Sequence, residues 1–346
     1  MINLKNPYNL LLILGIVVAT SYLAPKLKQT FKSEDEYDLI KKYLLNDSPL
    51  YGYNKPKLWI HTKYETNARK WKSFNSRNST DLNQPYIHLT IKSIINHCGN
   101  DFNVCLIDDD TFSKLIPNWD MNIQTVAEPL KSHYREIGLM NLLYFYGGMI
   151  VPNSFICMKN LKGLYDYGTS ENKPFVCENA NKTLNQFKDK YKTSFVPDTF
   201  FMGAPKNCAS IQDYIEFLKL INANGHFSSE NDFLGINSHW CTDEIEKQNM
   251  NLINGELIGI KTKKGRTIRI ENLMEEQYLD LNSNTYGIYI PADEVKRRVK
   301  YQWFAVLSSE DIFESDPIIV KYLKLSIVNT QSEYTKSSVI PSVVAL

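Results

Sequence analysis

The chain has 346 residues, of which 43% are hydrophobic and 22% are charged. These are the values of an ordinary globular protein, so they exclude a collagen-like, coiled-coil or wholly disordered chain. The 39 basic residues balance the 38 acidic ones, and no basic stripe with interleaved aromatic residues occurs, so nucleic acid is not an expected partner.

The N-terminal region contains a long uncharged apolar segment, Leu10 to Ala24, flanked by lysines. Extended back to Tyr8 it reaches the short end of the length that a membrane-spanning helix needs. Residues 1–32 are therefore predicted to be a single-pass membrane anchor. A cleaved signal peptide, with Val17 and Ala19 before the cut, and a buried helix of the body are the alternatives.

Residues 33–56 are predicted to form a stem helix and a linker. Ser33 and Glu36 match a capping box, apolar residues follow at helical spacing, and the segment after them is rich in turn-forming residues. The body is predicted to span residues 57–327. Residues 328–346 are polar and aperiodic and are predicted to be a C-terminal tail.

The body begins as alternating strands and helices. Apolar runs predict strands over 57–60 and 102–107. Between them, helical spacing predicts a helix that begins near Pro85 and ends at Gly99, which is expected in a left-handed conformation. Asp110 is then expected to cap a short helix.

The clearest predicted helix spans Pro129 to Tyr146 and ends at Gly147, where a positive φ is expected. Gly148 lets the chain reverse directly into a strand over 149–151. Strands that alternate with helices predict an α/β fold with a mostly parallel sheet, in which ligands bind at the carboxyl ends of the strands.

The second half gives weaker patterns. They predict a bent strand over 195–205, a helix over 211–220, a strand over 286–291 and a helical piece after Ser308.

The stretch from Arg135 to Val151, REIGLMNLLYFYGGMIV, resembles the core signature of glycosyltransferases with a DXD sugar-binding region, especially the capsular polysaccharide synthesis branch. In that family a helix with S-D-x-x-R and L-Y-x-Y-G-G runs into a strand that ends in D-x-D or D-x-T. Weaker resemblance extends over most of residues 57 to 320. The resemblance implies a GT-A-like α/β fold, a mostly parallel sheet flanked by helices, here preceded by the single N-terminal transmembrane helix.

The resemblance also implies a site. Its donor-binding candidates are Arg135, Glu136, Gly147, Gly148 and Asn153. Glu136 stands where the family has an acidic residue and is one candidate catalytic carboxylate. Asp198 is the other, as a base for an acceptor hydroxyl.

The positions that would hold a metal depart from the family. The two D-x-D aspartates fall on Pro152 and Ser154, and the expected arginine is Leu139. Proline offers no side-chain oxygen and serine only a neutral one, whereas Mg²⁺ and Mn²⁺ prefer anionic oxygens. No metal site is therefore predicted, dependence on Mn²⁺ or Mg²⁺ is not expected, and the cofactor stays unknown. The cluster 108–110 contains another D-x-D, but a turn that caps the next helix is the simpler interpretation.

Two functional hypotheses follow. The first is a membrane-anchored glycosyltransferase that moves a sugar from a nucleotide sugar to a glycan or protein acceptor, with Arg135 or Lys131 offsetting the diphosphate. The second is a catalytically inactive protein of the same fold with a structural or glycan-binding role at a membrane, such as in a virion, and with a protein partner. Both imply a single-pass membrane location whose orientation is left open. An unrelated α/β enzyme is a third alternative.

Overall fold

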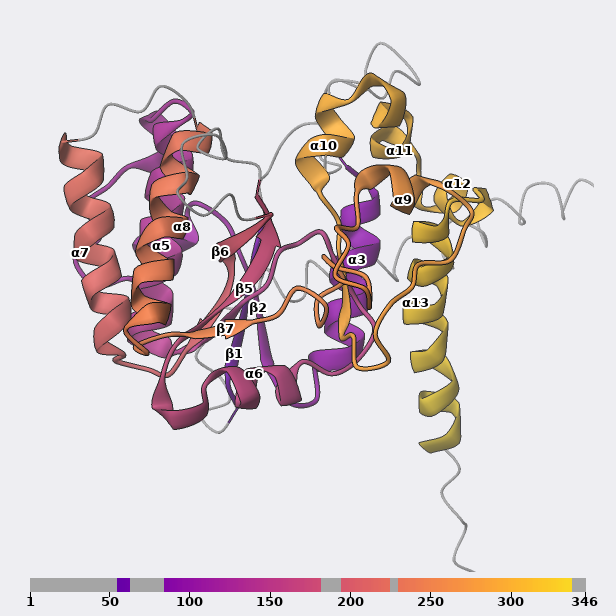
Figure 1. Ribbon diagram of the computed structural model, residues 1–346, viewed down its shortest axis with the longest axis horizontal. Helices are drawn as coiled ribbons and strands as arrows, with labels where there is room; N and C mark the ends of the chain where they lie inside the picture. Colours follow the sequence, from indigo (N-terminus) through magenta and orange to yellow (C-terminus); the bar gives the residue numbers. More distant parts are fainter. Residues whose placement is uncertain (1–54, 63–83, 182–193, 225–229, 338–346) are drawn as a thin grey trace, which may run out of the picture. The chain divides into compact units, whose positions relative to one another are not determined.

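A six-stranded sheet lies at the centre of the computed structural model (Figure 1), which describes residues 55–62, 84–181, 194–224 and 230–337. All of these residues belong to one unit of the chain, residues 46–346. The strands of the sheet are β1 (Lys57–His61), β2 (Asn103–Ile107), β3 (Gly148–Ile150), β5 (Phe175–Ala180), β6 (Phe195–Ala204) and β7 (Asn251–Ile253).

The strand order is β2-β1-β3-β6-β5-β7. β1 pairs in parallel with β2 and β3, and β5 pairs in parallel with β7. β6 runs antiparallel to both of its neighbours, β3 and β5. Five strands therefore share one direction, and the sheet is mostly parallel, as predicted.

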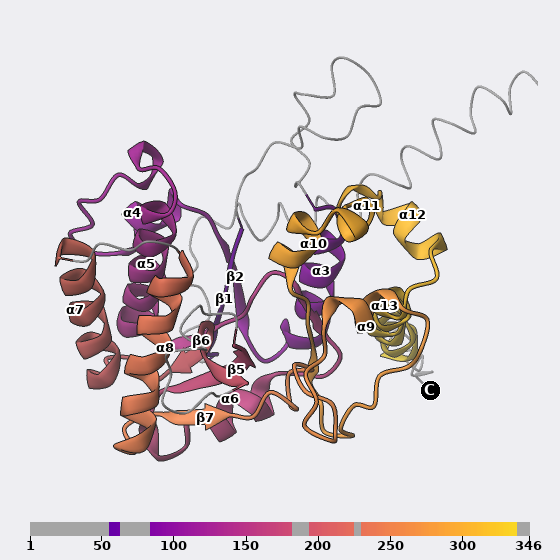
Figure 2. The ribbon, with the colours of Figure 1, turned by 45° about the horizontal axis from the view of Figure 1, so that its top comes forward.

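Helices lie on both sides of this sheet, which explains why β1 is apolar without alternation. Leu58, Trp59 and Ile60 are all fully buried, as expected for a parallel strand that is covered on both faces. Figures 1 and 2 show α5 (Leu130–Tyr146), α7 (Ala209–Asn224) and α8 (Glu230–Glu246) on one side. α3 (Tyr86–Cys98) and α13 (Ile318–Ser337) lie on the other.

The remaining elements are short. β4 (Phe155–Cys157) and β8 (Gly287–Tyr289) form a separate two-stranded antiparallel sheet. The short helices are α4 (Thr111–Leu115), α6 (Lys162–Gly168), α9 (Ile270–Met274), α10 (Ala292–Arg297), α11 (Gln302–Val306) and α12 (Ser309–Glu314). Single 3₁₀ turns occupy Ile123–Thr125, Ser170–Asn172 and Val299–Tyr301.

Several element ends differ in detail from the sequence predictions. Gly99 follows α3 with a φ of −60°, a right-handed conformation, so the predicted left-handed stop is wrong. Before α4, the side chain that binds the first turn belongs to Asp108 and not to Asp110: Asp108 Oδ1 accepts from the Thr111 amide at 3.0 Å. α13 continues to Ser337, across the boundary at 327/328 where the tail was predicted to begin.

Two sequence predictions are wrong for the described residues: a fold that includes a single transmembrane helix, and a single-pass membrane location. No helix in the described part of the chain is long and apolar enough to cross a bilayer. The longest of those helices, α13, carries Lys321 and Lys324, and such charges are costly in hydrocarbon. The segment Leu10 to Ala24, on which the prediction was based, lies outside the described residues.

Two glycines make the turn from α5 into β3. Gly147 has a φ of +67° and Gly148 a φ of +102°, values that side chains other than hydrogen rarely allow. A Cβ added to Gly148 would lie 2.2 Å from the carbonyl oxygen of Lys57. The Gly147 carbonyl accepts a buried hydrogen bond of 3.0 Å from Trp59 Nε1. The double glycine therefore joins α5, β3 and β1 at the start of β3.

We expect Gly148→Ala to lower the free energy of unfolding by at least about 3 kcal/mol, because it combines backbone strain with a collision against β1. Urea unfolding measures the loss. Gly265→Ala is the control, because Gly265 has a φ of +73° but nothing within 4 Å of its added Cβ. It should lose only about 1–2 kcal/mol. Equal losses in the two variants would contradict the role of the collision.

Candidate functional site

A cavity of about 880 Å³ lies at the carboxyl ends of β1 and β3. His61 at the end of β1 lines it, as do the residues after β3, the start of β6 and two C-terminal segments that contain Arg269 and Lys296. In α/β folds this edge of the sheet is where ligands bind, and pockets of this size hold small molecules. The cavity is therefore the candidate site.

Asp198 of β6 places a fixed carboxylate at the cavity wall. Its Oδ2 accepts a hydrogen bond of 2.6 Å from Asn179 Nδ2, and its Oδ1 accepts one of 3.0 Å from the Phe200 amide. The Tyr289 hydroxyl also hydrogen-bonds to it, and burial, together with the Asp198 charge, raises the pKa of Tyr289 well above its ordinary value. The sequence-predicted Asp198 thus lies in the candidate site with a defined orientation.

The three residues at the expected D-x-D region, Pro152, Asn153 and Ser154, also line the cavity. Asn153 Nδ2 donates to the His61 carbonyl at 3.2 Å, and Ser154 Oγ donates to the Ile290 carbonyl at 2.9 Å. These bonds fix the loop, and none of the three side chains is anionic. The part of the chain that the structure describes has no group of three or more His, Cys, Asp or Glu side chains arranged to hold a metal ion.

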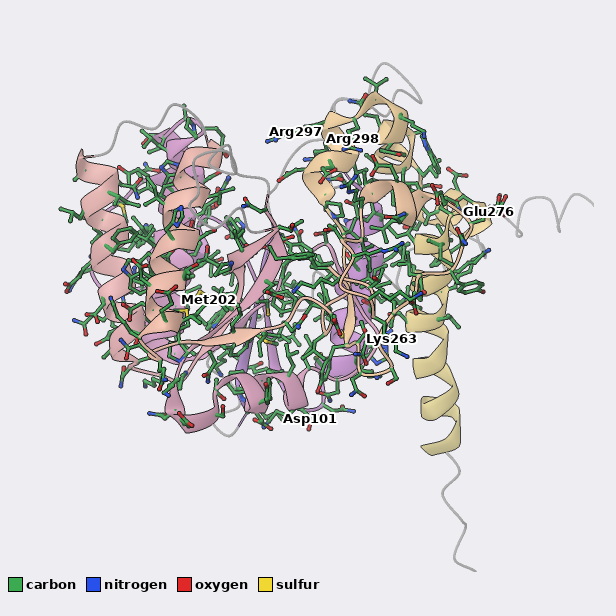
Figure 3. The ribbon with its side chains drawn as sticks, in the orientation of Figure 1. Asp101, Met202, Lys263, Glu276, Arg297 and Arg298 are labelled. Carbon is green, nitrogen blue, oxygen red and sulfur yellow. The ribbon has the colours of Figure 1, made fainter. Side chains whose placement is uncertain are left out.

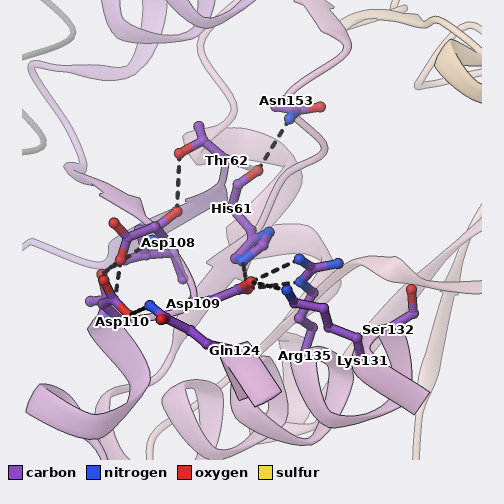
Figure 4. Close-up of polar contacts among 12 residues, drawn as sticks. His61, Thr62, Asp108, Asp109, Asp110, Gln124, Lys131, Ser132, Arg135 and Asn153 are labelled. Atoms are coloured by element: carbon purple, nitrogen blue, oxygen red, sulfur yellow. Dashed lines mark hydrogen bonds and ion pairs between the residues drawn. The ribbon is translucent and has the colours of Figure 1, made fainter. Parts of the chain in front are cut away.

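Arg135 lines the cavity, but its guanidinium is bound to two carboxylates, Asp109, which Figure 4 shows, and Glu128. Nε and Nη2 each donate to Asp109 at 2.7 Å, and Nη1 donates to Glu128 at 2.7 Å. His61 Nε2 lies 3.0 Å from the same Asp109, and Lys131 Nζ lies 4.0 Å from it. The cations that the sequence offered for a diphosphate are therefore already paired with acidic groups.

The contacts of Asp109 with Arg135 and His61 lower its pKa. Burial favours the neutral carboxyl, but the hydrogen bonds from Arg135 and His61 outweigh it and hold the pKa of Asp109 well below its ordinary value of 3.8. Asp109 belongs to the acidic cluster 108–110, so this cluster is more than a solvated turn. Its middle residue binds the end of β1 to α5.

Glu136 is buried behind the cavity and is not one of the residues that line it. Its carboxylate accepts hydrogen bonds from Thr199 Oγ1 at 2.7 Å, Tyr214 OH at 2.6 Å and Asn237 Nδ2 at 3.0 and 3.1 Å. These partners come from β6, α7 and α8, so one carboxylate on α5 connects four elements. Since Thr199 follows Asp198 directly, Glu136 fixes the strand that carries the cavity carboxylate.

Gly147 and Gly148 lie at the start of β3, whereas the cavity lies beyond its end. The two glycines thus belong to the turn described above, and neither lines the cavity. Of the sequence-predicted residues, the structure brings Arg135, Asn153 and Asp198 together at the cavity and places Glu136 directly behind Asp198.

Three cavity cations were missed by sequence reasoning: Arg269, Lys296 and Arg298. The available signal was the concentration of basic residues in KTKKGRTIR, residues 261–269, and KRRVK, residues 296–300. No periodic pattern connects these two segments, so their meeting at one cavity is a result of the fold.

No protein-family model and no curated protein matches the sequence. Among solved structures, the chain is similar to the PaToxG glycosyltransferase, with 13% identity and a TM-score of 0.34 over 56% of this chain and 70% of that one. The apo form of the glycosyltransferase GlyE from Streptococcus pneumoniae TIGR4 gives 10% identity and a TM-score of 0.39, over 84% of this chain and 66% of GlyE. These neighbours are glycosyltransferases, at values too low to assign a family, and the DXD and capsular-branch resemblance stays a prediction.

The Glu136 carboxyl gives stability a defined pH dependence. Burial raises its pKa from 4.5 to about 7, although the Tyr214 and Thr199 hydrogen bonds act in the opposite direction. The folded protein therefore binds more protons than the unfolded chain between these values. The stabilising contribution of protonated Glu136 is fully present below pH 4.5 and is lost as the pH rises through about 7, a change of roughly 3 kcal/mol.

We therefore expect Glu136→Gln to flatten the stability of the protein between pH 5 and about 7.5, as measured by urea unfolding. Asp109 does not interfere, because its lowered pKa affects stability only below its ordinary value of 3.8. Glu216→Gln, on the exposed side of α7, is the matched control and should leave the wild-type pH dependence unchanged. Retention of the full dependence by Glu136→Gln would remove Glu136 as its source.

Proposed function

We propose that the protein is a glycosyltransferase-like enzyme that binds a nucleotide sugar in the 880 Å³ cavity without a divalent metal. The observation that carries this proposal is the oriented carboxylate of Asp198 inside a large cavity at the ligand-binding edge of the sheet. The resemblance of residues 135–151 to glycosyltransferases supports the substrate class. The neutral loop from Pro152 to Ser154 supports the absence of a metal from the donor site.

In this proposal Asp198 acts as the general base. The acceptor hydroxyl oxygen forms a bond to the anomeric carbon of the donor sugar, the bond from that carbon to the phosphate oxygen breaks, and the nucleoside diphosphate leaves. The hydroxyl proton passes to Asp198. The hydrogen bonds from Asn179 and the Phe200 amide keep the carboxylate in place during this step.

In this proposal Glu136 is not the catalytic or donor-binding residue that the sequence predicted. Because it contacts Thr199 and does not line the cavity, it positions the strand and does not touch the substrate. Arg135 likewise stabilises the end of β1 through Asp109.

A second candidate is a catalytically inactive protein that binds a sugar nucleotide or glycan in the same cavity. The observation that favours it is that both Asp198 oxygens already accept hydrogen bonds, and that the Ser154 hydroxyl donates to the protein itself. Such a cavity would recognise a sugar without offering a strongly basic oxygen. The two candidates share a ligand class and differ in turnover.

The test is calorimetric binding of uridine and guanosine diphosphate sugars to the full chain in EDTA, followed by assays of sugar transfer and donor hydrolysis. We expect binding without metal and a slow turnover that Asp198→Asn lowers by about 100-fold or more, in line with loss of a general base. Asp213→Asn on the exposed side of α7 is the matched control and should leave both unchanged.

Each result has one meaning. Binding with no turnover in wild type would favour the inactive candidate. Turnover that survives in Asp198→Asn would remove Asp198 from the mechanism. Failure of the wild-type protein to bind any of these donors would contradict the enzyme and would restrict the inactive candidate to glycan binding.

A further inference from the structure

We propose that the phosphate groups of the ligand bind to a cationic wall formed by Arg269, Lys296 and Arg298, on the side of the cavity opposite the sheet. This inference rests on the proposed function, because it names the part of the site that would hold the diphosphate of a nucleotide sugar. It places the diphosphate away from the end of β3, where the D-x-D residues would have held it through a metal.

Two segments of the C-terminal part of the chain supply this wall. Arg269 comes directly before α9, Lys296 lies within α10, and Arg298 follows α10. Figure 3 labels Arg298 beside Arg297 at the end of α10, among the C-terminal helices. Cations from both segments thus line one cavity together with Asp198.

The charge of the two segments is strongly positive. Residues 261–269 and 292–300 contain nine Lys or Arg residues and two acidic ones, Asp293 and Glu294. Both of these acidic residues also line the cavity, so the wall carries charges of both signs, with an excess of cations behind it. An excess of this kind speeds the approach of anionic ligands to a concave site, whereas the cations that line the cavity are the ones proposed to hold them.

Arg298 of the wall is more exposed than Arg135, and so are its ion pairs. The Arg135 side chain is 9% exposed and donates three hydrogen bonds of 2.7 Å to Asp109 and Glu128. The Arg298 side chain is 46% exposed, and its two partners, Glu271 and Glu294, are themselves partly exposed. Exposed ion pairs contribute little to stability. A diphosphate can therefore replace these carboxylates at Arg298, but it cannot easily replace Asp109 at Arg135.

Arg269 and Arg298 act on one common acidic group. Burial would raise the pKa of Glu271, but a backbone hydrogen bond, Arg298 and Arg269 together lower it. Glu271 and Glu294 together offset these two guanidinium groups, and Lys296 adds a third cation to the wall. Arginine is suited to this role because its planar donors bind phosphate oxygens in pairs.

The double variant Arg269→Gln with Lys296→Gln tests the wall. The probes are uridine diphosphate, guanosine diphosphate, inorganic pyrophosphate and uridine, titrated into the full chain in EDTA by calorimetry. We expect the double variant to weaken both diphosphates and pyrophosphate by about 100-fold and to leave uridine unchanged, since each lost cation removes charge-assisted bonds to phosphate.

The matched control is Arg266→Gln with Lys300→Gln. It removes the same charge from the same two segments, but both residues are exposed and neither lines the cavity. Its affinities should stay within about threefold of wild type, because distant exposed charges are screened by salt. A loss as large as that of the double variant would mean that general charge, and not the wall, attracts the ligand, and would overturn the inference.

The outcomes separate this inference from the proposed function. If the double variant binds both diphosphates and pyrophosphate as wild type does, the phosphates bind elsewhere and the wall is refuted, while the nucleotide site stands. If wild type binds pyrophosphate through the wall but no sugar nucleotide, the wall stands and the proposed function fails. If wild type binds neither diphosphates nor pyrophosphate, the wall is refuted.

Discussion

The candidate site depends on one buried carboxylate. Glu136 accepts hydrogen bonds from β6, α7 and α8 at once, and its position on α5 ties these elements to the helix that leads into β3. A buried carboxyl group is costly unless it is hydrogen-bonded. Loss of the bond between Glu136 and Thr199 would therefore remove a constraint on the strand that carries Asp198.

The cationic side chains around the cavity form two sets, one that stabilises the fold and one that a ligand can reach. His61 and Arg135 form close contacts with Asp109 on the sheet side, where they stabilise the fold. Arg298 lies on the opposite side in exposed ion pairs that a ligand can replace, and Arg269 lines the cavity with it. In the proposed site, side chains would supply the positive charge for a diphosphate, in place of a metal bound by D-x-D aspartates.

The sequence could predict features that depend on neighbouring residues, but not those that depend on residues far apart in the chain. The α5 helix, Gly147 and the strand after it were predicted correctly because each depends on neighbouring residues. The role of Glu136 was not predicted, because Tyr214 and Asn237 lie 78 and 101 residues away in the chain. α8 was missed because its sequence, ENDFLGINSHWCTDEIE, has few apolar residues to form a periodic stripe. The cationic wall was not predicted because Arg269 and Lys296, like Glu136 and its partners, meet only through the tertiary fold.

The central claim is that one cavity holds a nucleotide sugar between Asp198 and the cationic wall. The most direct measurement is a crystal structure of the full chain with a bound uridine or guanosine diphosphate sugar, prepared in EDTA. The account predicts diphosphate density within hydrogen-bond distance of Arg269 or Lys296 and sugar density beside Asp198. Diphosphate density at Pro152 to Ser154, or a ligand outside this cavity, would contradict it.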